Sequence, residues 1–252
     1  MQQAISAIAR SKAARLCERH IAAAMFSVAK RILAAASKYS HNSRITNEGA
    51  FNDEARRIAI GAVDSTEAFI SDYALASTKY YGIEGSGIMS FLTSAFHGAT
   101  SRERTTKYMA NFAEDIVRMV KAGVLLGYPS SKILSAIRTG YKDPYPTSII
   151  TKARKYDINI ATPSYGQGIF HSAYQNIARN ARQMIAVAWG MAERQYGEEH
   201  GAIGFTSHRG SSFPCPICDD ETTYIHKMTD PFPPYHINCV CWVRFIYNDN
   251  EN

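Results

Sequence analysis

Residues 213–241 read FPCPICDDETTYIHKMTDPFPPYHINCVC and contain four of the five cysteines of the chain. Cysteines gathered in this way indicate either a metal site or local disulfides, and a cytoplasmic setting favours the metal. A Cys-x-x-Cys pair in a tight turn can place two thiolates about 2.3 Å from one tetrahedral zinc ion. The fifth cysteine, Cys17, lies in an alanine-rich stretch, where we expect a buried and inert thiol.

Five side chains in this stretch compete for the four positions around a tetrahedral ion. Cys215 and Cys218 form the first pair, and the second pair must come from His236, Cys239 and Cys241. We predict that Cys215, Cys218, His236 and Cys239 bind the ion, with Cys241 in reserve or in place of His236. Two local disulfides, or ordinary buried thiols, are the alternatives.

The predicted ligand set is typical of a structural metal ion rather than a catalytic one. A catalytic zinc ion keeps an open position, whereas a thiolate-rich set fills the coordination shell. A module of about 50 residues also needs such a staple, because its own core is small. His208 and His226 flank the cluster and are expected to be ordinary surface or strand residues, and the acidic run Asp219–Glu221 is expected to be a solvated turn. We therefore expect one structural zinc ion per chain and no enzymatic activity.

Apolar residues recur at helical spacing through the first 200 residues. The first helix is expected over residues 4–38, and four of its apolar residues share one face, namely Ile21, Met25, Val28 and Ile32. A second helix is expected from about Asn52, with its apolar stripe formed by Ile58, Ala62, Phe69 and Tyr73. Two more helices are expected from Thr100 to Gly127 and from Ser131 to Arg138. After a turn at Pro144 and Pro146, the last long helix is expected from Gly168 through Phe170 to Gly197.

The character of the sequence changes after Gly201. The segments AIGFTSH, TTYIH and VCWVRFIY are short and rich in β-branched or aromatic residues, and turn residues separate them. We therefore expect a mainly α protein. In this fold a multi-helix domain at residues 1–200 precedes a zinc-stapled α+β module of short antiparallel strands at residues 201–252, which we call the C-terminal module.

Composition and charge narrow the class of protein. Hydrophobic residues make up 46% of the chain and charged residues 20%, which is typical of a globular protein. No apolar run approaches the roughly 20 residues that span a bilayer, so we expect a cytoplasmic protein without membrane contact. The net charge is +6, and residues 1–57 hold this excess, with ten Lys/Arg against four Asp/Glu.

The basic, alanine-rich residues 1–40 allow two interpretations. As an arm, they would dock on an acidic protein surface or on nucleic acid, and this is the interpretation that the charge favours. Alternatively, the basic residues are a solvated helix face, and the helix belongs to the core through the apolar face that begins at Ile21.

Three segments resemble one known family. They are IARNARQMIAVAW at 177–189, GFTSHRGSSFPCPICDD at 204–220 and PFPPYHINCVCWV at 231–243. Together they are similar to the C-terminal part of Mu F-like phage head morphogenesis proteins, also called minor head or minor capsid proteins. That family shows a Cys-x-x-Cys turn followed by Pro-Pro-x-His-x-x-Cys-x-Cys, which is matched here by Pro233, Pro234, His236, Cys239 and Cys241.

The resemblance extends over residues 105–247, and its C-terminal end is the specific part. The chain departs from the family at Arg179-Asn180-Ala181, where an Arg-Thr-Glu element is usual, and at Val240, where many members have Arg. The resemblance implies a low-copy structural component of the virion, located in the phage head near the portal vertex and in the host cytoplasm during assembly. Its implied partners are the portal protein and other head proteins, with packaged DNA as a further contact of the basic N-terminal segment.

Two other functions are compatible with the same residues. A zinc-stapled nucleic-acid-binding protein would use the basic N-terminal segment. A nuclease of the His-Asn-His type is suggested by His236-x-Asn238, but its frame needs a second His or Asn on a following helix, and the residues after Cys241 are strand-like.

Overall fold

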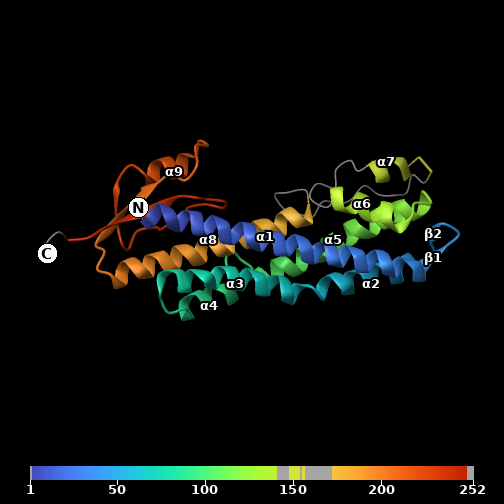
Figure 1. Cartoon of the computed structure of the whole chain (residues 1–252), viewed down its shortest axis with the longest axis horizontal. Coiled ribbons are helices and arrows are strands. Elements are labelled where there is room, and N and C mark those ends of the chain that lie inside the picture. Colours follow the sequence, from blue (N-terminus) through green and yellow to red (C-terminus); the bar gives the residue numbers. More distant parts are fainter. Residues whose placement is uncertain (1, 141–147, 154, 157–171, 249–252) are drawn as a thin grey trace. The chain divides into compact units, whose positions relative to one another are not determined.

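The computed structural model describes residues 2–140, 148–153, 155–156 and 172–248, and it confirms the predicted fold class. The protein is mainly helical, with short antiparallel strands near the C-terminus (Figure 1). In chain order the elements are α1 (Gln2–Ala35), η1 (Ala36–Tyr39), β1 (Ser40–His41), β2 (Arg44–Ile45), α2 (Glu48–Ile60), α3 (Val63–Tyr81), α4 (Ser86–Thr93), α5 (Ser101–Leu125), α6 (Ser130–Gly140), α7 (Ser148–Ala153), α8 (Ala173–Glu199), β3 (Gly204–His208), α9 (Pro216–Glu221), β4 (Ile225–Lys227) and β5 (Trp242–Ile246).

The helix expected from Asn52 through Tyr73 is in fact two helices, α2 and α3. Gly61 is the C-cap of α2, and its N–H donates to the carbonyls of Arg57 and Ala59. Glycine is about 1 kcal/mol less favourable than alanine inside a helix, so the chain turns there instead of continuing. The expected start of the last long helix at Gly168, together with Phe170, Pro144 and Pro146, lies outside the described residues.

The chain packs into two compact units, each built from separated stretches of sequence. The first unit comprises residues 1–18, 68–101 and 179–252, and the second comprises residues 19–67 and 102–178. The C-terminal module thus shares its unit with three helical stretches. The change from helix to short strands falls between Glu199 and Gly204, while the division into domains at residue 200 stays a prediction.

In the second unit, α1 contributes fully buried side chains to the core. Ile21, Met25 and Ile32 are 0% exposed and Val28 is 2% exposed. In the same unit, a polar contact joins η1 to α2, since Tyr39 donates a hydrogen bond to Glu54 at 3.1 Å. The burial favours the interpretation in which this helix belongs to the core rather than forming a separate arm.

In the first unit, α8 is bound to α3 and to the start of α1. The indole Nε1 of Trp189 donates to the carbonyl of Tyr73 at 3.1 Å, and the ring of Tyr80 packs against the indole. Ser6 on α1 donates to the buried carboxylate of Glu193 at 2.8 Å. Burial raises the pKa of Glu193, so its few polar partners matter to the packing of these helices.

The C-terminal module contains a three-stranded antiparallel sheet with the order β4-β3-β5. The central strand places Phe205 opposite His226 on one side and opposite Phe245 on the other. Phe205, Val243 and Phe245 form a small buried cluster. A core of this size stabilises a module only weakly by itself, so the module needs further contacts.

One such contact is made where the C-terminal module meets α8. A Cβ atom at Gly190 would collide with the carbonyl oxygen of Pro233, because the backbone of residues 233–234 lies directly on the helix. A glycine in the middle of a long helix is explained by this close approach rather than by helix propensity. The absence of a side chain at Gly190 therefore makes room for residues 233–234. These residues directly precede the predicted ligands His236, Cys239 and Cys241.

We predict that Gly190→Ala lowers stability although alanine is the better helix former. Overpacking costs about 1–3 kcal/mol and exceeds the gain of about 1 kcal/mol in helix propensity. Urea unfolding measures the difference. Gly49→Ala in α2 is the matched control, since nothing lies within 4 Å of a Cβ at Gly49, and it should be neutral or stabilising. A Gly190→Ala protein as stable as the unchanged chain would contradict the close packing.

Candidate metal centre

The first pair of thiols is presented by the short helix α9. Cys215 is the N-cap of this helix, and Pro216 lies in its first turn. Amide groups of the first turn have no partner within the helix, so the missing N–H of proline costs no helical hydrogen bond there. The amide of Asp219 donates to the carbonyl of Cys215 at 2.8 Å and closes the turn. Residues three apart on a helical turn lie on the same side, so Cys215 and Cys218 can face one ion.

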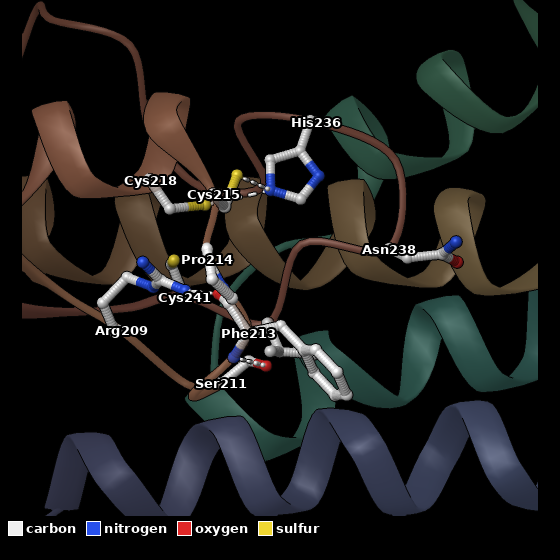
Figure 2. A pocket seen from close by; sticks show the side chains of 10 residues that line it. Arg209, Ser211, Phe213, Pro214, Cys215, Cys218, His236, Asn238 and Cys241 are labelled. Atoms are coloured by element: carbon white, nitrogen blue, oxygen red, sulfur yellow. Dashed lines mark hydrogen bonds between the residues drawn. The ribbon is translucent and has the colours of Figure 1, made fainter.

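The second group comes from residues 233–241, which we call the ligand loop. The amide of Cys239 donates to the carbonyl of His236 at 3.0 Å, which brings these two residues together across a tight turn. Asn238 completes this turn with a φ of 63°, in the left-handed region that asparagine tolerates better than most residues. In Figure 2 the Asn238 amide is directed away from the sulfur atoms.

The side chains from the two segments converge. His236 Nε2 lies 3.2 Å from the sulfur of Cys215 and 2.9 Å from the sulfur of Cys218 (Figure 2). The sulfurs of Cys218 and Cys239 lie 3.9 Å apart. Two sulfurs on one tetrahedral zinc ion are separated by about 3.8 Å, given zinc–sulfur bonds of about 2.3 Å. The spacing of these two sulfurs fits a shared metal ion, while His236 Nε2 lies at hydrogen-bond distance from its two sulfurs. All five cysteines are free thiols, contrary to the disulfide alternative.

All five residues predicted from the sequence take part in this cluster, in two groups of possible metal ligands. Cys215, Cys218 and His236 form one group, and Cys218, Cys239 and Cys241 form the other, with the donor atoms of each group within 4.8 Å of one another. Cys218 belongs to both groups. Cys215 and His236 are partly exposed, whereas the other three are buried. Which four of the five bind an ion stays a prediction.

The imidazole of His236 is oriented for ligation. Its Nδ1 lies 2.8 Å from the carbonyl oxygen of Ile237, and because a carbonyl only accepts, Nδ1 is the protonated nitrogen. Nε2 then carries the lone pair and faces the sulfurs of Cys215 and Cys218. Metal-binding histidines generally donate their other ring N–H in this way, which fixes the tautomer.

Burial and mutual hydrogen bonds shift the pKa values of the thiols in the cluster. Burial raises the pKa of the Cys218 thiol to about 12. A hydrogen bond from Cys241 lowers the pKa of Cys239 to about 5, and the same hydrogen bond, together with burial, raises the pKa of Cys241. The crowded thiols therefore share their protons unequally, and a nearby cation would bring the others to the thiolate form that metals bind.

Arg209 and Asp219 brace the first turn, although the sequence suggested only a solvated acidic run at Asp219. The Arg209 guanidinium forms an ion pair with Asp219 and also donates to the carbonyl of Phe213. The other carboxylate oxygen of Asp219 accepts from the amide of Cys215 at 3.3 Å. The position of Asp219 directly after Cys218 was the one available signal for this brace.

Arg10 holds the end of the ligand loop. This arginine of α1 is 6% exposed, and its Nη2 donates to the carbonyl of Cys241 at 2.7 Å. At Gly210 a Cβ atom would collide with the carbonyl oxygen of Val240, so the loop is also closely packed there. No sequence pattern pointed to Arg10, because it lies far from the cysteines along the chain.

The two flanking histidines lie outside both ligand groups, as expected. His226 is 1% exposed, stacks on Phe205 at 4.6 Å and donates from Nε2 to the carbonyl of Glu221. His208 stacks on the indole of Trp242 at 4.3 Å. Both therefore have structural roles in the sheet.

Comparisons with known proteins identified no relative of this chain. No protein-family model, curated protein or solved structure matches the chain. Among the described residues, no helix combines the length and the apolar character needed to cross a membrane. The functional argument therefore rests on the cluster and on the residues around it.

We predict that Arg209→Ala weakens metal binding about 10–100-fold, because residues that orient ligands have effects of this size. Competition with a chromogenic chelator measures the affinity. Arg209→Lys keeps the charge but not both contacts, so it should restore binding only in part. Arg56→Ala, an exposed arginine of α2, is the control and should bind metal normally. Unchanged affinity in Arg209→Ala would show that the brace has no part in positioning Cys215.

Proposed function

We propose that Cys215, Cys218, His236 and Cys239 bind one structural zinc ion, with Cys241 as the reserve ligand or as the replacement of His236. The observation that carries this proposal is the convergence of sulfur and imidazole donors on Cys218 from two separate segments. Sulfur and imidazole ligands in a tetrahedral arrangement are the usual surroundings of zinc in proteins.

The proposed ion would stabilise the C-terminal module. The buried cluster of the sheet is small, and α9 and the ligand loop are short segments that a shared ion would join. Free energy of metal binding becomes folding free energy when the site does not exist in the unfolded chain. A histidine whose Nε2 faces two sulfurs is also poorly placed as a catalytic base, which supports a role without enzymatic activity.

We further propose that the protein is a minor head protein of a tailed phage, a low-copy structural component of the virion near the portal vertex. The support is the resemblance, since the matched residues Pro233, Pro234, His236, Cys239 and Cys241 are those of the ligand loop. Its partners would be the portal protein and other head proteins, and α1 would supply basic side chains for contact with packaged DNA. During assembly the protein would be in the host cytoplasm.

The zinc proposal predicts about one zinc ion per chain in protein purified without chelator, measured by elemental analysis. Cys218→Ser should remove most of the metal and the near-ultraviolet circular dichroism of the C-terminal module, while the helical signal persists. Cys17→Ala is the matched control, because Cys17 is buried in α1 outside both ligand groups, and it should keep its zinc. Metal-free protein with an intact C-terminal module would contradict the proposal.

The phage proposal predicts that genes encoding a portal protein and other head proteins lie beside the gene of this chain. The neighbouring portal protein, co-expressed with a tagged copy of the chain, should co-purify with it. Cys218→Ser should abolish this association if the C-terminal module makes the contact. Plasmid nicking by the purified protein, lost in His236→Ala, would instead support the His-Asn-His nuclease.

A further inference from the structure

A cavity of about 510 Å³ lies beside the ligand loop, within the first compact unit. The start of α1 and the middle of α8 form two of its walls, and residues 238–240 of the ligand loop form the third. Its charged lining consists of Arg10, Arg15, Arg182 and Glu18. Neither the zinc ion nor the phage role assigns any task to this cavity.

The guanidinium groups of the cavity outnumber its carboxylates. Arg182 pairs with Glu18 at 3.2 Å, but its Nε is buried without a hydrogen-bond partner. Arg10 uses Nη2 for the carbonyl of Cys241. Arg15 is exposed and has no ion pair among the residues that the structure describes. The lining therefore keeps a net positive charge, and the exposed guanidinium of Arg15 is accessible to an anionic group.

The remaining lining is small and partly apolar. Ala14 and Ala186 line the two helical walls, and Val240, which is 38% exposed, lies on the loop. Short side chains leave room for those of a ligand, and alanine and valine contact its carbon atoms.

We propose that this cavity binds an acidic segment of a partner protein, with Asp or Glu carboxylates on Arg15 and Arg182. Guanidinium forks match carboxylates in a bidentate geometry. Nucleic-acid backbones instead follow extended basic grooves and stack their bases on aromatic side chains. This cavity is lined by short stretches of three elements and has no aromatic residue in its lining, so a mixed acidic and apolar peptide fits it better.

Fluorescence anisotropy with a short labelled peptide rich in glutamate and leucine tests the proposal on the full chain. Arg15→Glu should weaken peptide binding at least about tenfold, as expected when one partner of a close charge pair is reversed. Arg56→Glu makes the same change in net charge on α2, at a residue that does not line the cavity, and should bind nearly as well as the unchanged chain. Glu18→Gln should strengthen binding, because it removes the competing carboxylate.

The same measurements can overturn the proposal. If Arg15→Glu and Arg56→Glu weaken peptide binding equally, the peptide responds to the net charge of the protein and not to the cavity, and the proposal is wrong. A labelled single-stranded oligonucleotide that binds more tightly than the peptide, and depends on Arg15 in the same way, would make the cavity a phosphate site. Absence of peptide binding at low salt would also refute it. Zinc content and thermal melting of each variant establish that the variants are folded. A protein without zinc that still binds the peptide through Arg15 would contradict the metal proposal and support the peptide proposal.

Discussion

The C-terminal module depends on the meeting of two short segments at the sulfur of Cys218. This thiol belongs to both groups of possible ligands, so α9 and the ligand loop are joined through it. Neither segment is part of a sheet or a long helix, since α9 is a six-residue helix and the loop is irregular. Crowded thiols in a buried setting repel one another as thiolates, and a cation converts that repulsion into attraction. The rest of the module can be understood as support for this junction.

The support comes from helices that are remote in sequence. Gly190 lets the start of the ligand loop lie on α8, and Arg10 holds the end of the loop from α1. Burial raises the pKa of Glu193, and the hydrogen bond from Ser6 and the charge of Arg10 oppose this rise, so buried polar groups connect α1, α8 and the loop. A buried charge without such partners would cost several kcal/mol. The helices are therefore part of the environment of the site and not only a carrier for it.

Much of the candidate site could be predicted from the sequence. All five ligand candidates were recognised, because the ability to bind a soft metal resides in the residue type and the spacing is local. The fold class was predicted for a similar reason, since apolar periodicity reports whether a segment is helix or strand. The break at Gly61 was missed because an apolar stripe that passes through a helix end looks the same as one that continues. The charge of residues 1–40 left open whether they form an arm or part of the core, and the full burial of Ile21 and Met25 favours the core.

The sequence by itself determined which side chains form the candidate metal-binding groups and that helices precede a small stranded module, because these properties depend on residues close together along the chain. Only the tertiary structure decided that Arg209 and Asp219 brace the cysteine turn, that Arg10 reaches the carbonyl of Cys241, and that α1, α8 and the ligand loop enclose a cationic cavity. The physical reason is distance along the chain. Contacts such as that of Arg10 with Cys241 arise from how whole elements pack, and no local pattern records them.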